Sequence, residues 1–200
     1  MTKPKPPTTD VLISAAPWKR ALPTAAALCR RAAAAAWEGA PAALKRKTGG
    51  GELAVVLTTD AAIRKLNRTW RGKDKPTNVL SFPAAAAGDL RGPGEFILGD
   101  VVVAYATVAK EAKEAGKSLK DHLSHMVVHG VLHLLGYDHE TTPDAETMES
   151  LETKILSRLG VSDPYSAPAA ASGPAKTRGT RSVKTRGAHS VKTRGARRPL

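Results

Sequence analysis

Hydrophobic residues along the chain first gather in short apolar runs, which predict strands. Residues 11–15, 52–58, 78–82 and 95–105 are rich in valine, leucine and isoleucine. The last run contains Gly99, and a glycine inside a strand often marks a bulge. We therefore expect four strands, the fourth of them bulged near Gly99.

Longer segments carry the spacing of amphipathic helices. The first is rich in alanine and follows Pro23, and the second follows Asp60, which can cap it. Residues 40–51, which end in three glycines, are expected to form a loop. Strands followed mostly by helices, with short connections, predict an α+β fold with helices packed on a sheet. The expected helices are 24–37, 61–70, 107–116, 118–135 and 144–160.

Composition divides the chain into one folded domain, residues 1–165, and a tail, residues 166–200. The tail begins with a Pro/Ala/Ser linker and continues as three eight-residue basic repeats. Its few apolar residues cannot offset the entropy lost on ordering, so we expect disorder. Residues 2–9 are also expected to be loose.

Charge is concentrated in this tail. The net charge is +13, and the tail carries nine basic residues and no acidic one, which leaves +4 for residues 1–165. Such a tail favours a polyanionic partner such as RNA, while a role in solubility stays open.

The single cysteine, Cys29, excludes an internal disulfide and a cysteine-based zinc finger, which fits a reducing compartment. Lysines and prolines interrupt the first residues, so no signal peptide is expected, and no run approaches the roughly 20 apolar residues of a membrane span. We expect a cytoplasmic protein that does not contact the membrane.

The segment HGVLHLLGYDH, residues 129–139, holds three of the six histidines. His129 and His133 lie one helical turn apart and therefore on one face. Gly136 can end the helix, and a short turn can bring His139 back toward the same point. Three neutral nitrogens with an open fourth position are typical of catalytic Zn²⁺, which lowers the pKa of bound water to roughly 7.

Alternatives to this metal site follow from the same residues. His125 and His129 have the same spacing as His129 and His133, and a buried histidine is often only a hydrogen-bonded core residue. The third ligand, His139, favours the later pair. The pattern also matches HExxHxxGxxH of metzincin proteases except that Gly130 replaces the glutamate base, so a zinc metalloprotease is the alternative enzyme.

HGVLHLLGYDH resembles the signature of the YbeY-type endoribonucleases, which are bacterial rRNA maturation factors. The resemblance extends to residues 66–83, 98–104 and 148–165, and it covers about residues 50–165. It implies a mostly parallel small sheet, one zinc ion on His129, His133 and His139, and cleavage of single-stranded RNA. The implied role is 16S rRNA 3′-end maturation and ribosome quality control on the small ribosomal subunit. A non-catalytic assembly factor with a structural metal is a further alternative.

The same resemblance assigns catalytic roles to Arg71 and His129. A guanidinium can bind a phosphodiester and balance developing charge, although Arg71 could also cap its helix or lie in solvent. The nucleophile is expected to be a metal-activated hydroxide, with the ribose 2′-hydroxyl as the alternative. Asn78 stands where the family often has an aspartate. Other polar residues that could line the cleft or orient the histidines are Asn67, Thr77, Ser81, Asp100 and Asp138.

Overall fold

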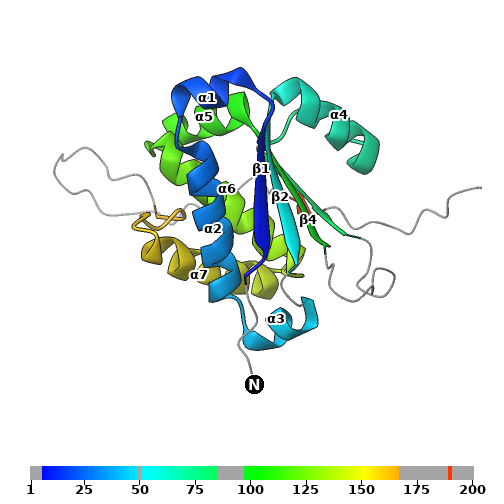
Figure 1. Cartoon of the computed structure of the whole chain (residues 1–200), viewed down its shortest axis with the longest axis vertical. Coiled ribbons are helices and arrows are strands. Elements are labelled where there is room, and N and C mark those ends of the chain that lie inside the picture. Colours follow the sequence, from blue (N-terminus) through cyan, green and yellow to red (C-terminus); the bar gives the residue numbers. More distant parts are fainter. Residues whose placement is uncertain (1–5, 49–50, 85–96, 167–188, 191–200) are drawn as a thin grey trace, which may run out of the picture.

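The computed structural model describes residues 6–48, 51–84, 97–166 and 189–190 (Figure 1). Its sheet has the order β1-β2-β4-β3-β5. The first three strands in this order are parallel to one another, β3 runs antiparallel to β4, and β5 pairs with β3 in parallel. The predicted α+β fold with a mostly parallel sheet is therefore confirmed. The strands are β1 Thr8–Ile13, β2 Glu52–Thr58, β3 Val79–Pro83, β4 Ile97–Ala104 and β5 His189–Ser190.

The predicted helices are present, with ends shifted by a few residues. Two further helices were not predicted. α3 contradicts the loop expected at residues 40–51, and α1 is an additional helix. α3 occupies most of the expected loop, because the alanine, leucine, lysine and arginine that follow Pro41 are good helix formers. α1 begins with Pro17 in its first turn and buries Trp18. The helices are α1 Ala16–Ala21, α2 Ala25–Gly39, α3 Ala42–Thr48, α4 Asp60–Arg71, α5 Tyr105–Glu114, α6 Leu119–Leu134 and α7 Thr142–Arg158.

Helices α2, α6 and α7 cover one face of the sheet, and α4 lies on the other (Figure 1). Alternate residues of β4 divide the apolar residues into two clusters. Val101 and Val103 belong to the main core, which α2, α6 and α7 complete. Val102 and Ala104 belong to a smaller cluster that includes Ile63 of α4. Thus α4 packs on the face of the sheet opposite α6.

The predicted bulge in β4 is confirmed. Glu52 pairs with Ile97 but Leu53 pairs with Gly99, so Leu98 is the extra residue. Gly99 has φ +136°, and a Cβ there would collide with the carbonyl oxygen of Phe82. The close approach of β3 to β4 therefore requires glycine at this position.

The chain ends fit their predictions only in part. Residues 2–9 were expected to be loose, yet Thr8 and Thr9 belong to β1 and pair with β2. The predicted linker and tail lie outside the described residues, apart from Ser166 and the two residues of β5. Within the described part of the chain, no helix has the length and apolarity needed to cross a bilayer.

Candidate functional site

Helix α6 carries four imidazoles along one side. Ser118 caps its first turn by accepting a hydrogen bond from the backbone N–H of Asp121, at 3.0 Å. At the other end Gly136 has φ +96°, and the N–H of Tyr137 donates to the carbonyl of Leu132 at 3.0 Å. This turn brings His139 back toward the helix, as the sequence predicts.

The three histidines of the motif converge. The ring centroid of His139 lies 5.0 Å from that of His133 and 5.6 Å from that of His129. One ring nitrogen from each of the three lies within 4.8 Å of the other two. Two of the three residues are buried, so the nitrogens meet at the edge of the core rather than in open solvent.

Hydrogen bonds fix the tautomers of two of these rings. Nδ1 of His133 lies 2.9 Å from the carbonyl oxygen of Tyr137, which can only accept, so this nitrogen carries the proton. Nδ1 of His129 lies 2.7 Å from a carboxylate oxygen of Glu152 and is likewise the donor. In the neutral rings both Nε2 atoms therefore present lone pairs, and these two atoms lie 3.1 Å apart.

Two facing lone pairs at that distance repel unless a cation lies between them. Protonation of His133 does not supply one, because burial, followed by the neighbouring His129 and His139, lowers its pKa to about 3. Two nitrogens bound to one tetrahedral zinc ion at about 2.0–2.1 Å would be roughly 3.3 Å apart. The donor set of these residues therefore fits a metal ion.

The rival pair, His125 and His129, is bridged by a carboxylate. Nε2 of His125 lies 3.0 Å from Oε2 of Glu152, whose Oε1 accepts from His129. These three residues also come close enough to surround an ion. However, Nε2 of His125 and Nδ1 of His129 donate to Glu152. Hydrogen bonds therefore already satisfy these two nitrogens without a metal.

Glu152 is the central site residue that lies outside the histidine motif. Its side chain is fully buried on α7, and it also accepts a short hydrogen bond from the hydroxyl of Tyr165. Burial alone would raise the pKa of this carboxyl, but hydrogen bonds from His125 and His129 lower it below its usual range. A glutamate on the face that carries Met148, Ile155 and Leu156 was a signal in the sequence, because such a charge needs partners.

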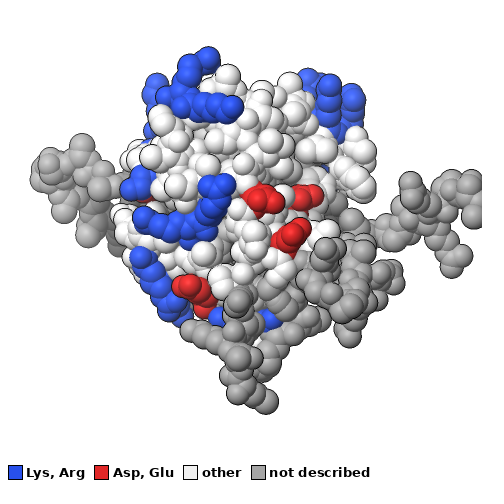
Figure 2. All heavy atoms as spheres, viewed as in Figure 1, with Lys and Arg blue, Asp and Glu red and all other residues white. Residues whose placement is uncertain are grey.

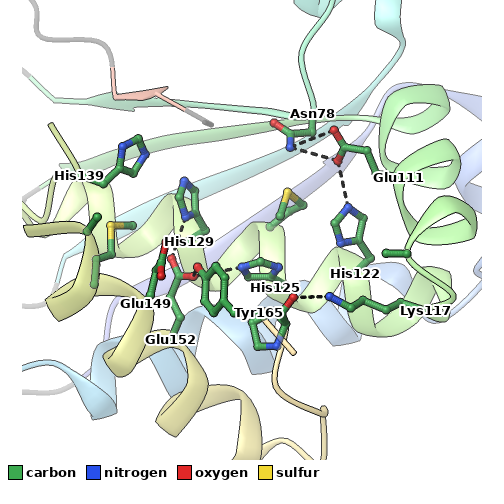
Figure 3. A pocket seen from close by; sticks show the side chains of 15 residues that line it. Asn78, Glu111, Lys117, His122, His125, His129, His139, Glu149, Glu152 and Tyr165 are labelled. Atoms are coloured by element: carbon green, nitrogen blue, oxygen red, sulfur yellow. Dashed lines mark hydrogen bonds and ion pairs between the residues drawn. The ribbon is translucent and has the colours of Figure 1, made fainter. Parts of the chain in front are cut away.

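A cavity of about 420 Å³ extends from this centre along α6 (Figure 3). His129 and His139 line one end, together with Glu149, whose pKa is raised by burial and by the nearby charge of Glu152. At the other end Glu111 accepts from the side-chain amide of Asn78 at 3.1 Å and from Nε2 of His122 at 3.0 Å. The cavity is therefore large enough to hold more than a metal and its water.

The polar residues considered for the cleft have different positions. Asn78 lines the cavity. Asn67 is buried and donates to the carbonyl of Lys75 at 2.7 Å, and Ser81 donates to the carbonyl of Gly130 at 3.0 Å. These two side chains hold a loop and a helix in place. The carboxylate of Asp138 accepts from the backbone N–H of His139 at 2.8 Å, whereas Glu152 and the carbonyl of Tyr137 orient the rings.

Arg71 lies at the end of α4, on the other face of the sheet, and is not among the residues that line the cavity. Its side chain is half-buried, and burial lowers the pKa of its guanidinium. None of the described carboxylates forms an ion pair with it. A half-buried cation without an acidic partner is suited to an anion, so its role in binding phosphate stays a prediction.

Gly130 explains why the protease base is absent. A Cβ at this position would lie 2.6 Å from Cγ1 of Val101 and 3.1 Å from Oγ of Ser81. A side chain here would therefore point into the sheet. The close contact of α6 with β3 and β4 leaves no room for a glutamate.

A family model described as Endoribonuclease YbeY matches residues 22–160. The chain belongs to this family. Proteins named Endoribonuclease YbeY from Bradyrhizobium diazoefficiens and from Bradyrhizobium sp. strain BTAi1 are 50% and 52% identical to it. The matches cover 82% and 80% of this chain and 88% and 92% of those relatives. A solution structure of TM1509 from Thermotoga maritima aligns with a TM-score of 0.47 and 25% identity, over 80% of this chain and 99% of that one.

For a YbeY-family chain, the histidine centre is the part of the described structure with the chemistry of a hydrolase. The family match includes α2 through α7, so the whole scaffold that holds the four imidazoles lies within it. Membership identifies the chain as an endoribonuclease, an enzyme whose substrate is RNA.

Proposed function

We propose that this chain is a zinc-dependent, single-strand-specific endoribonuclease whose metal is held by His129, His133 and His139. The observation that carries the proposal is the 3.1 Å approach of the Nε2 atoms of His129 and His133, whose Nδ1 atoms bond to Glu152 and to the carbonyl of Tyr137. The family name supports RNA as the substrate. The nitrogen donors and the half-buried, three-histidine set are typical of catalytic zinc.

Each residue of the centre has a separate task in this proposal. A bound zinc ion supplies Lewis acidity and makes water a nucleophile near neutral pH. Glu152 and the carbonyl of Tyr137 hold His129 and His133 with their Nε2 lone pairs facing the same point. Outside the centre, at the end of α4, Arg71 binds a phosphate of the RNA and balances its negative charge. Tyr165 lines the cavity and donates a hydrogen bond to the Glu152 carboxylate.

The cellular role that we propose is maturation of the 3′ end of 16S rRNA and quality control of the small ribosomal subunit, in the cytoplasm. The resemblance of the motif blocks to the YbeY-type endoribonucleases supports this role. A strain that lacks the gene should accumulate 16S rRNA precursors with extended 3′ ends, and expression of the wild-type chain should remove them.

We further propose that residues 1–165 form the catalytic domain and that residues 166–200 add salt-sensitive affinity for RNA. The nine positive charges of the tail can displace counterions from several phosphates. Deletion of residues 166–200 should flatten the salt dependence of RNA binding and leave cleavage chemistry intact. An unchanged salt dependence would indicate a role in solubility.

The test of the enzymatic proposal combines metal analysis with two substrates. Purified protein should contain one zinc ion, cleave single-stranded RNA and leave casein intact. His139→Ala should lose both metal and cleavage, whereas His122→Ala, on the same helix but outside the triad, should keep the metal. Casein cleavage would support the protease alternative. Folding that depends on metal, without RNA cleavage above a metal-stripped control, would support a structural metal.

A further inference from the structure

The surface of α4 combines an exposed aromatic ring with unpaired basic side chains. Trp70 is 53% exposed, although tryptophan is usually well buried. Its ring lies 6.0 Å from that of Phe82 on β3, with an angle of 69° between the ring planes. Phe82 thus contacts one edge of the indole, while more than half of the surface of Trp70 faces solvent.

Basic residues outnumber acidic ones around this ring. Between Asp60 and Lys75 the chain has six basic and two acidic residues. Asp60 faces away, because its carboxylate accepts from the backbone N–H groups of Ala106 and Thr107 at the start of α5. Figure 2 shows the basic side chains gathered at the upper right, where α4 lies in Figure 1.

Asp74 neutralises only one part of this surface. Both of its oxygens accept from Arg64 at 2.9 Å, and Arg68 lies 3.9 Å away. No described carboxylate forms an ion pair with the other three cations beside Trp70 in the sequence. These cations are Arg71, Lys73 and Lys75.

The loop that presents the two lysines is held in place. Gly72 ends α4 with φ +65°, and its N–H donates to the carbonyl of Arg68 at 3.0 Å. The side-chain amide of buried Asn67 donates to the carbonyl of Lys75 at 2.7 Å. The backbone that carries the two lysines is therefore held before any ligand binds, so binding has to order only their exposed side chains.

We infer that Trp70 is a stacking platform for a base of single-stranded RNA, with Arg71, Lys73 and Lys75 binding the adjacent phosphates. A flat aromatic surface flanked by positive charge is how proteins bind single strands without reading sequence. Duplex RNA offers no free base face to such a ring, so the surface selects unpaired RNA. This inference deepens the proposed function, because it names residues that select single strands.

The platform and the histidine cavity lie on the two sides of one strand. Along β3, Ser81 bonds α6 and the next residue, Phe82, supports Trp70. A strand of RNA that extends past β5, which pairs with β3 at this side of the sheet, can reach both faces. The platform would then hold nucleotides next to the one that is cleaved.

The test uses the fluorescence of the full-length protein. Trp18 and Trp37 are 0% and 1% exposed, so a ligand that stacks on tryptophan can quench only Trp70. An unstructured oligoribonucleotide should quench the emission, whereas a duplex of the same sequence should not. An oligomer of abasic ribose phosphates should also fail to quench, although it carries the same charge.

Substitutions then separate stacking from charge. Trp70→Ala should weaken binding of the single strand roughly tenfold to a hundredfold at unchanged salt dependence, and Trp70→Phe should retain most of the affinity. The double substitution Lys73→Ala/Lys75→Ala should instead reduce the slope of log affinity against log salt concentration by about 0.7 per lysine. Leu12→Ala, at an equally exposed apolar residue of β1, is the matched control and should bind normally.

Equal RNA affinity of Trp70→Ala and Leu12→Ala would overturn the inference and leave Trp70 as a contact for another protein. Equal quenching by the abasic oligomer would also overturn it. The proposed function fails separately: wild-type protein that binds no metal and cleaves no RNA would contradict it, whatever the quenching shows.

Discussion

Oε1 of Glu152 lies 2.7 Å from Nδ1 of His129, inside a pocket where the carboxylate has no contact with solvent. This contact determines which nitrogen of the imidazole carries the proton. It leaves Nε2 of His129 as the atom that can bind a metal, in line with the usual pairing of ligand histidines with carboxylates.

Replacement of Glu152 by Gln should weaken zinc binding by about 10- to 100-fold, because a neutral amide polarises the imidazole less and can present its N–H₂ group to Nδ1. Competition with a chromophoric chelator measures the affinity. Glu111→Gln is the matched control, since Glu111 makes the same kind of contact with His122, which is outside the triad. Equal zinc affinity in Glu152→Gln and wild type would contradict this role.

Gly130→Ala should destabilise the protein by about 1–3 kcal/mol, because the new methyl group overlaps Val101. Urea denaturation of the two proteins gives the difference. The double substitution Gly130→Ala/Val101→Ala should cost less than the sum of the two single changes, since it makes room for the methyl group. If the free-energy changes of the two single substitutions are strictly additive, then residues other than Val101 move to relieve the overlap with the new methyl group.

Arg71→Ala should lower the rate of RNA cleavage on the order of a hundredfold and leave zinc content unchanged. The physical reason is the loss of a half-buried positive charge that no described carboxylate neutralises. Arg68→Ala is the comparison, because its guanidinium is exposed and lies near Asp74. Loss of metal in Arg71→Ala would indicate a structural role instead.

An RNA with a single 2′-deoxy sugar at the scissile position should still be cleaved, because the proposed nucleophile is water. Product analysis should then show no 2′,3′-cyclic phosphate from the all-ribose substrate. If the modified RNA binds but resists cleavage, the 2′-hydroxyl is the nucleophile.

Cys29 should not react with iodoacetamide in the native protein at pH 8. Burial raises the pKa of this thiol to about 12, whereas the pKa of an exposed cysteine thiol is roughly 8.5. The thiolate is the reactive form, so alkylation of the unfolded chain should rise with pH up to about 9 while the native chain stays unmodified. Mass spectrometry follows the reaction, and rapid native alkylation would mean that α2 opens locally.

Much of the fold could be predicted because local signals and tertiary packing agree. Apolar runs at β2 and β4 and the glycine at the end of α6 each have one favourable structure. Asp60 was expected to cap α4, but the N-cap is Thr59, whose hydroxyl accepts from the backbone N–H of Ala62. α3 was predicted as a loop because three glycines follow it, although the six residues 42–47 are good helix formers. Whether this segment forms a helix or a loop depends on the relative strength of the helix formers and the glycines, which a sequence pattern does not give.

The candidate site was predictable where it is local and not where it is assembled from distant elements. The return of His139 to α6 depends on ten residues of sequence. Glu152 meets His129 only because α7 packs on α6, and Tyr165 meets Glu152 only because the chain turns back after α7. The position of Arg71 across the sheet likewise depends on which face α4 covers.

The alanine-rich side of α2 has a consequence for the rigidity of the centre. Ala25, Ala32, Ala33 and Ala36 are all buried, and α2 packs against α6. Alanine has no side-chain rotamers to lose on burial, so this contact forms without that entropic penalty. It also has no rotamers to exchange afterwards, which leaves α6 against a surface that cannot rearrange. The imidazoles should therefore keep their spacing at temperatures where a leucine-packed helix pair would begin to repack.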